Sequence, residues 1–197
     1  MNNYDKILNY AKENNGYIMT KEAKDLEINS TFLTNLVNNK QLEKVGTGIY
    51  KLPEYPIDNF YILSKVSKKM CYSHVTSLYL HNMSDRIPLI YDVTVPYNYS
   101  GNLLKNKNVT LRYVKNDVFE LGKINIKTVN DLTVKCYDLE RTICDIIKDK
   151  NHIDKEIYAK ALKEYAKSKN KNIFKLVKYA RILGVEKEVI EVMELLL

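Results

Sequence analysis

The sequence has few cysteines and no long apolar run, and each of these shortages excludes a class of protein. The three cysteines, Cys71, Cys136 and Cys144, fit neither a disulfide framework nor a CxxC zinc site. A transmembrane helix would need a run of about 18 apolar residues, and none is present. The first residues lack a basic segment followed by an apolar one, so no signal peptide is expected. These absences predict a cytoplasmic protein without membrane contact.

Several motifs of enzymes are also missing. Neither a GxxxxGK[ST] loop nor a GxGxxG turn occurs, so we expect no nucleotide cofactor. His74 and His81 are seven residues apart, whereas zinc ligands that share a helix are usually closer, so structural roles are expected for both. The only acidic-x-Lys triplet, at residues 22–24, is predicted to be helical, but the compact nuclease signature requires a strand. We therefore expect no enzyme activity, no cofactor and no metal ion.

The N-terminal quarter of the chain follows the order of a winged helix-turn-helix. Apolar residues at helical spacing predict a helix within residues 1–15. Thr20 is expected to N-cap a second helix, and a third is predicted over residues 31–40. Residues 42–53 contain two β-prone segments around a glycine turn, which predicts a β-hairpin. Such a domain usually places its third helix in the DNA major groove.

The polar face of the third predicted helix supplies candidates for reading DNA. Asparagine amides pair with adenine, and threonine methyls contact thymine. The predicted hairpin and the start of the second helix supply phosphate contacts. The DNA-binding candidates are Thr20, Lys21, Ser30, Thr31, Thr34, Asn35, Asn38, Lys40, Lys44, Thr47 and Lys51. The alternative is an ordinary solvent-exposed helix face.

The net charge of +7 lies outside this domain. Residues 1–55 hold seven Lys and seven Asp or Glu, whereas residues 148–181 hold eleven Lys or Arg and four Asp or Glu. Phosphate neutralisation supplies much of the affinity of proteins for DNA, so residues 1–55 alone are expected to bind weakly. Two lysine stripes on consecutive predicted helices are either a second surface for nucleic acid or an acidic protein, or a solvated face. They consist of Lys160, Lys163, Lys167, Lys171, Lys175 and Lys178.

The fold class expected is α+β, with the winged helix-turn-helix at residues 1–55 and a mixed domain at residues 56–197. Alternating and β-branched segments predict a β-rich middle section at 89–95, 109–114, 118–121, 124–127 and 132–136. Helical spacing and capping residues predict helices at 60–68, 73–83, 139–148, 155–167, 172–184 and 185–197. Asp138 and Asp154 are the expected N-caps of two of them, and Phe174 is expected to face inward.

The order of four segments resembles the AbiEi family, the antitoxins and transcriptional repressors of abortive-infection AbiE toxin–antitoxin pairs. The segments are GTGIYKLP at 46–53, YSHVTSLYLH at 72–81, SDRIP at 84–88 and DLERTICD at 138–145. The resemblance implies that the N-terminal domain binds inverted repeats in promoter DNA and represses its own operon. It also implies that the C-terminal domain counteracts a nucleotidyltransferase-like toxin during phage defence, with or without a direct complex.

Two other functions are kept as alternatives. A ligand-responsive winged-helix regulator should have a mostly apolar pocket with a few convergent polar groups. A nucleic-acid-processing enzyme should bring several charged side chains together in its β-rich middle. The candidates for such a cluster are Asp92, Asp117, Glu120 and Lys123.

Overall fold

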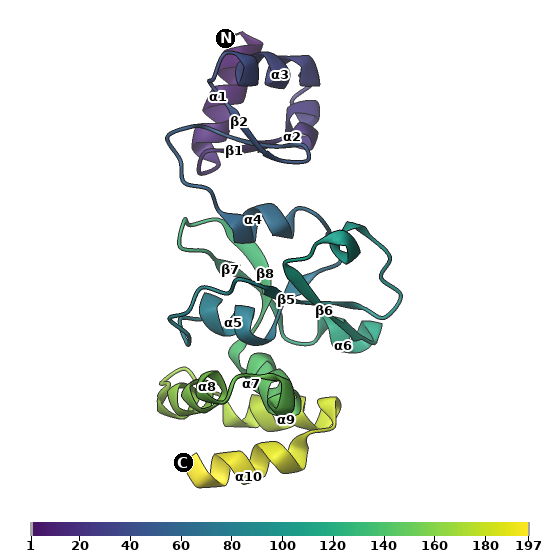
Figure 1. Ribbon diagram of the computed structural model, residues 1–197, viewed down its shortest axis with the longest axis vertical. Helices are drawn as coiled ribbons and strands as arrows, with labels where there is room; N and C mark the ends of the chain where they lie inside the picture. The colour runs from purple at the N-terminus through teal and green to yellow at the C-terminus, as the bar shows by residue number, and fades with distance from the viewer. Residues whose placement is uncertain (1, 197) are drawn as a thin grey trace. The chain divides into compact units, whose positions relative to one another are not determined.

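The computed structural model describes residues 2–196 and shows an α+β protein with two sheets and a helical C-terminal end (Figure 1). The chain divides into two compact units. Unit 1 comprises Met1–Val66 and Lys127–Thr133, and unit 2 comprises Ser67–Ile126 and Val134–Leu197. The expected boundary at residues 55–56 lies inside unit 1.

Unit 1 combines short helices with a small antiparallel sheet. Its elements are α1 (Asn3–Glu13), β1 (Tyr17–Met19), α2 (Thr20–Asp25), α3 (Ser30–Asn38), β2 (Glu43–Gly46), β3 (Ile49–Lys51) and α4 (Asn59–Ser64). The sheet order is β1-β3-β2, so β3 pairs on both sides. The β2–β3 pair confirms the predicted hairpin. The sequence prediction missed β1, because three residues are too few to show an alternating pattern.

The helices of unit 1 pack through the apolar positions that their spacing predicts. Ile7 and Ala11 of α1 lie on one face and are fully buried, as are Leu33 and Leu36 of α3. Tyr50 of β3 belongs to the same core. The helices therefore bury one face each and leave the opposite face of α3 to solvent.

The start of α2 differs from the prediction. Thr20 is the first residue of the helix, and Met19 is its N-cap. The backbone N–H of Met19 donates to the Glu22 carboxylate at 2.8 Å. The backbone N–H of Thr20 donates to the carbonyl of Gly48 at 2.9 Å, which ties α2 to the β2–β3 turn. The prediction that Thr20 is the N-cap of α2 is therefore wrong, because β1 continues directly into the helix.

Unit 2 contains the second sheet and most of the helices. Its elements are β4 (Cys71–Tyr72), α5 (His74–Leu80), β5 (Tyr91–Pro96), β6 (Val109–Val114), α6 (Asn116–Glu120), β7 (Lys123–Lys127), β8 (Thr133–Tyr137), α7 (Leu139–Lys148), α8 (Lys155–Lys167), α9 (Ile173–Leu183) and α10 (Glu186–Leu196), with 3₁₀ turns at Asn102–Lys105 and Lys150–His152. The sheet order is β6-β5-β4-β8-β7. Strands β5 and β6 are parallel, as are β4 and β8, whereas β4 and β5 are antiparallel.

The C-terminal helices form one apolar core around α7. Ile143, Ile146 and Ile147 of α7 pack in the same cluster as Leu176 of α9 and Val189 of α10. Figure 1 shows α8, α9 and α10 gathered around α7. The predicted bounds of α7 and α8 are confirmed, because an aspartate N-cap and an apolar period mark both helices.

Four local predictions, three of them in unit 2, differ from the structure in type, length or burial. Residues 118–121 were expected to form a strand, but most of this segment lies in α6. The predicted helix at 73–83 is shortened to α5, and the one at 60–68 (in unit 1) to α4. Phe174 is 93% exposed, because Leu176, Ala180 and Leu183 form the buried stripe of α9. Two apolar stripes compete on this helix, and packing selects the one that excludes Phe174.

Candidate functional site

The exposed face of α3 is the surface of unit 1 that carries the most hydrogen-bonding side chains expected to read DNA. Thr31, Thr34 and Asn38 recur at about one turn and are all exposed. The other exposed members of the predicted set next to or within this helix are Ser30 and Lys40. Because Leu33 and Leu36 hold the opposite face in the core, the orientation of the polar face is fixed.

Two members of the α3 set have protein partners. The side-chain amide of Asn35 is half-buried and donates to the hydroxyl of Tyr4 at 3.1 Å. The Tyr4 ring is packed edge-on against Phe32, with centroids 4.9 Å apart. The hydroxyl of Thr31 donates to the side-chain oxygen of the N-cap Asn29 at 2.7 Å. Asn38 is therefore the asparagine of α3 that is more accessible to a ligand.

The β2–β3 turn presents two further predicted residues. Lys44 and Thr47 are exposed, as is Lys21 of α2. Gly48 follows Thr47 with φ +67, a left-handed conformation that favours glycine and lets the chain turn back into β3. The turn therefore holds a lysine and a hydroxyl close to the solvent.

Lys51 and Thr20 do not fit the phosphate contacts expected of them. Lys51 is only 2% exposed, and its ammonium lies 2.7 Å from the Glu43 carboxylate. The same ammonium donates to the carbonyls of Leu52 and Pro53. Thr20 has its backbone N–H bonded to the hairpin, as described above. Both residues stabilise the hairpin instead, because the tertiary fold gives their polar groups partners within the protein.

The lysine stripes of unit 2 are less uniform than the sequence suggests. Lys160 is ion-paired with Asp85, and Lys175 lies 2.9 Å from Asp138 and 3.4 Å from Glu140. Lys175 is thus mainly a structural residue, which corrects its assignment to an open polyanion surface. The remaining four are Lys163, Lys167, Lys171 and Lys178.

Those four lysines differ in how freely they face solvent. The ammonium of Lys171 is close to the Ser168 carbonyl, at 3.4 Å, and Lys167 is 3.9 Å from Glu164. Lys163 and Lys178 are exposed and have no ion pair among residues 2–196. These two lysines are therefore the part of the stripes most available to a partner.

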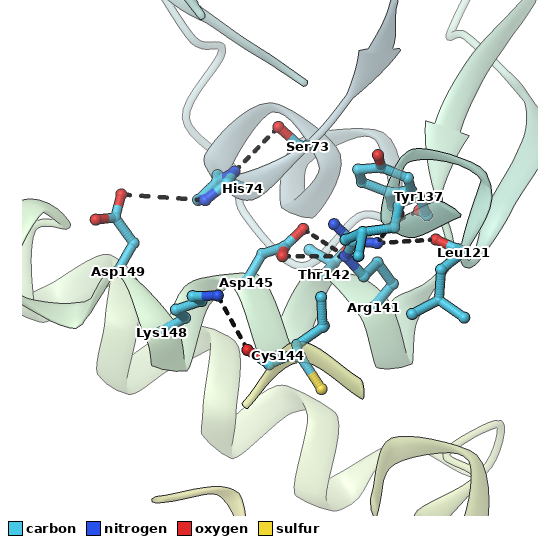
Figure 2. Close-up of polar contacts among 12 residues, drawn as sticks. Ser73, His74, Leu121, Tyr137, Arg141, Thr142, Cys144, Asp145, Lys148 and Asp149 are labelled. Carbon is cyan, nitrogen blue, oxygen red and sulfur yellow. Dashed lines mark hydrogen bonds and ion pairs between the residues drawn. The ribbon is translucent and has the colours of Figure 1, made fainter. Parts of the chain in front are cut away.

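A buried polar cluster lies where α7 meets α6 and β8 (Figure 2). Arg141 is 1% exposed, and its Nε donates to both carboxylate oxygens of Asp145, at 3.0 and 3.1 Å. Its Nη1 donates to the carbonyls of Val118 and Leu121, at 2.7 and 3.1 Å. Its guanidinium also lies over the Tyr137 ring, 4.2 Å from the centroid. The i, i+4 spacing of Arg141 and Asp145 predicts their ion pair, but only the structure shows that the pair is buried.

A second set of charged groups surrounds His74 (Figure 2). His74 has φ +46, an unusual conformation for a residue with a Cβ, at the first position of α5. Its Nδ1 lies 3.0 Å from the Ser73 hydroxyl, and its Nε2 lies 4.0 Å from Asp149. Burial lowers the pKa of His74 below its ordinary value. The neutral imidazole is therefore favoured in this site.

Arg112 joins the carboxylates near His74. It lies 3.4 Å from Asp92 and is ion-paired with Asp149. Serine, histidine and aspartate thus lie in line, as in a nucleophile triad, but Ser73 is fully buried and offers no accessible hydroxyl. Charged groups cluster here as they do in many active sites, but in this protein they are ion-paired with one another.

The other residues considered for catalysis or metal binding have local partners. Lys123 is 2.6 Å from Glu120, and Asp117 accepts from the backbone N–H of Val118 at 2.9 Å. His81 donates from Nε2 to the Tyr137 carbonyl at 2.7 Å. Within residues 2–196, no group of three His, Cys, Asp or Glu side chains is placed to hold a metal ion.

One hollow of about 300 Å³ lies in unit 2 between α8 and the loop after α5. Its lining combines apolar side chains with four charged ones and a serine: Met83, Ser84, Asp85, Arg86, Glu156, Ile157 and Lys160. Arg86 pairs with Glu156 at 3.0 Å, and Lys160 pairs with Asp85. This lining differs from the mostly apolar pocket expected of a small-molecule sensor.

Comparisons with known proteins bear on the fold alone. No family model matches the chain, and no curated protein matches it. The crystal structure of RV2827C protein from Mycobacterium tuberculosis is similar, with a TM-score of 0.62 and 8% sequence identity. The match covers 98% of this chain and 76% of that chain. Separately, none of the helices described here is long and apolar enough to cross a membrane.

Proposed function

We propose that unit 1 is a winged helix-turn-helix that binds double-stranded DNA through α3. The observation that carries the proposal is the exposed polar face of Thr31, Thr34 and Asn38 on a helix followed directly by a hairpin. The lysine and hydroxyl of the hairpin, Lys44 and Thr47, suit phosphate contacts. A helix inserted in the major groove reads bases through side chains of this kind.

The charge balance of the chain suggests that unit 1 alone has a low affinity for DNA and that other residues supply further phosphate contacts. Its first 55 residues are neutral, and burial removes Lys51 from the surface. Exposed lysines of unit 2, above all Lys163 and Lys178, could supply further phosphate contacts through counterion release. Unit 2 therefore carries a second proposed surface for phosphate contacts, on the helices α8 and α9.

The four segments that resemble the AbiEi family lead to a more specific proposal. The chain acts as an antitoxin and represses its own operon by binding inverted repeats in the promoter. Unit 2 counteracts a nucleotidyltransferase-like toxin, with or without a direct complex. The polar hollow gives little support to a ligand-responsive regulator, and the buried Ser73 gives little support to a nucleic-acid-processing enzyme.

The DNA-reading role is tested by Asn38→Ala with Asn108→Ala as the matched control. Asn108 is an exposed asparagine of unit 2, on none of the helices assigned to DNA contact. Loss of a bidentate contact from Asn38 should weaken operator binding by about 1–3 kcal/mol and relax the sequence preference. Fluorescence anisotropy with operator and scrambled duplexes measures both. Equal affinities for the two variants would contradict the assignment of α3.

The antitoxin role is tested separately by growth. The proposal expects a nucleotidyltransferase-like toxin to be encoded beside this chain. Co-expression of this chain with that toxin should restore growth of cells that the toxin arrests. Asn38→Ala should restore growth equally well, because antitoxicity is assigned to unit 2. Continued arrest in the presence of the parent chain would contradict the antitoxin proposal without affecting the DNA-binding one.

A further inference from the structure

A second hollow of unit 2, of about 390 Å³, lies beyond the carboxyl ends of the parallel strands β5 and β6. Its lining comes from Tyr97 and Asn98, which follow β5, and from Lys115 and Asn116, which follow β6. These residues come together because the last residues of the two strands are paired in register. Figure 1 shows β5 and β6 side by side, with α6 close to them. The carboxyl ends of parallel strands are where open α/β sheets bind their ligands.

The polar side chains around this hollow have no partner within the protein. All four lining residues are exposed, and their side chains make no hydrogen bond or ion pair with any of residues 2–196. In the hollow beside α8, by contrast, the four charged side chains pair with one another. Asp117, the carboxylate next to Asn116 in sequence, accepts from the backbone N–H of Val118. The hollow between the ends of β5 and β6 therefore keeps its polar groups available to a ligand.

The loop after β5 is ordered without using the Tyr97 ring. The backbone N–H of Tyr99 donates to the carbonyl of Pro96 at 2.9 Å. The Tyr99 side chain packs against Gly101, where an added Cβ would lie 2.4 Å from the tyrosine hydroxyl. Leu103 is fully buried and anchors the 3₁₀ turn that follows. Tyr97 is instead 78% exposed, so its ring is presented at the hollow by a loop that other residues hold in place.

The groups at this hollow match the parts of a nucleotide. An exposed aromatic ring is the surface on which proteins stack an unpaired base. A side-chain amide both donates and accepts, so it pairs with the polar edge of a base. A lysine without an ion pair suits a phosphate. The volume lies at the lower end of the range for ligand pockets, roughly 300–1,000 Å³, which suits a ligand of the size of one nucleotide.

We propose that this hollow, the β5–β6 hollow, binds an unpaired nucleotide of a single-stranded nucleic acid. The Tyr97 ring stacks on the base, and the Lys115 ammonium pairs with the phosphate. The amides of Asn98 and Asn116 bond to the edge of the base. The lining residues are all exposed, so a strand can enter and leave the hollow on its open side. A base inside a duplex is stacked on both faces and cannot reach the ring, so this site is distinct from the duplex site proposed on α3.

The first test compares two strands that carry the same charge. Fluorescence anisotropy of the full chain should show that a labelled strand of ten deoxyadenosines binds about tenfold more tightly than an abasic strand of equal length. Tyr97→Ala should remove this difference, and Tyr97→Phe should retain it, because phenylalanine also stacks on a base. Phe174→Ala removes an exposed aromatic ring that does not line the hollow and should leave the difference unchanged. Thermal unfolding establishes that each variant is folded.

The second test concerns the phosphate. Lys115→Gln should make the slope of log K against log[salt] for the deoxyadenosine strand shallower by about 0.7. Lys135→Gln, at an exposed lysine of β8 outside the hollow, should change that slope less. Asn38→Ala should leave strand binding unchanged, so that a failure of this proposal is distinguishable from a failure of the duplex-binding one.

Three outcomes would overturn the proposal. The first is equal affinity of the parent chain for the deoxyadenosine strand and the abasic strand, which would reduce the binding to charge alone. The second is an equal loss of the difference in Phe174→Ala and Tyr97→Ala. The third is free deoxyadenosine monophosphate that competes as well as the strand at equal nucleotide concentration, since the ligand would then be a free nucleotide.

Discussion

The helices α3 and α7 carry similar numbers of polar side chains but use them in opposite ways. In α3, Thr31, Thr34 and Asn38 are exposed, and the core holds only the apolar face. In α7, Arg141 and Asp145 are buried and satisfy each other. The difference shows that polar residues at helical spacing do not by themselves identify a binding face. What distinguishes the two helices is whether neighbouring elements supply partners for the polar groups.

The burial of charge in α7 has an energetic consequence that α3 lacks. Removing one member of a buried ion pair leaves the other charge without compensation, and this is strongly destabilising. Exposed polar residues lose only contacts with water when they are replaced, so stability changes little. Substitutions in α7 should therefore act on folding, and substitutions in α3 should act on DNA binding.

The largest expected effect is that of Arg141→Met. The variant leaves Asp145 buried without its partner and removes the bonds to the Val118 and Leu121 carbonyls. We expect a loss of about 3–5 kcal/mol in the free energy of unfolding, measured by urea denaturation. Asn38→Ala is the control and should change stability by less than about 0.5 kcal/mol. Equal stabilities of the two variants would remove the distinction between the helices.

A second prediction compares two aspartate N-caps. Asp138 accepts from the backbone N–H of Arg141 and also contacts Lys175 and Tyr179. Asp154 is an exposed cap of α8 that accepts from the backbone N–H groups of residues 156 and 157. Asp138→Ala should therefore lower stability by about 2 kcal/mol and Asp154→Ala by about 1 kcal/mol, as measured by thermal or urea unfolding. The reverse order would show that the additional contacts of Asp138 contribute nothing.

A third prediction concerns pH and separates the two units. All three histidines lie in unit 2, and burial lowers the pKa of His74 and His81 in the folded protein. The unfolded chain then binds more protons than the folded one, so stability falls as the pH drops through the ordinary histidine pKa of about 6.5. The stability that the neutral histidines contribute is fully present above that pH.

Hydrogen exchange at pH 7.5 and 6.0, corrected for intrinsic rates, measures this effect. Protection should decrease in the core of unit 2 and stay constant in unit 1. His81→Gln keeps a hydrogen-bond donor for the Tyr137 carbonyl and should reduce the pH dependence. Equal losses of protection in both units would contradict the assignment to the buried histidines.

The smallest expected effect on stability is that of Lys163→Gln, which tests the contribution of unit 2 to DNA binding. Lys163 is exposed and has no ion pair in the described part of the chain, so stability should change by less than about 0.5 kcal/mol. Loss of one phosphate contact should make the slope of log K against log[salt] shallower by about 0.9. Lys160→Gln, at a lysine paired with Asp85, should change the slope less. An unchanged slope for Lys163→Gln would limit the DNA interface to other residues.

Local patterns predicted much of the fold. The bounds of α7 and α8, the β2–β3 hairpin and the end of α9 at Gly184 followed from N-caps, a glycine turn and a left-handed C-cap. Strand β1 and helix α6 were missed or misassigned. Strand β1 is stabilised by pairing with β3, and residues 118–121 are short and apolar enough to suit either structure.

The candidate site was predicted less completely than the fold. Helical spacing identified the polar face of α3, but it could not show that Asn35 bonds to Tyr4 or that Lys51 is buried. The spacing also identified the pair of Arg141 and Asp145 without indicating its burial. In each case the missing information was the position of a residue distant in the sequence.

The sequence by itself determined where α7, α8 and α9 begin and end, because caps and apolar periodicity act within a few residues of each other. It also determined the charge of each segment, including the basic α9 and the acidic α10. Only the tertiary structure decided which polar groups remain available to bind a ligand and which are paired within the protein. Lys51 and Arg141 lost that availability because a buried charge is stable only beside partners, and folding brings those partners from other elements. Lys175 lost it because it pairs with the buried carboxylates of Asp138 and Glu140.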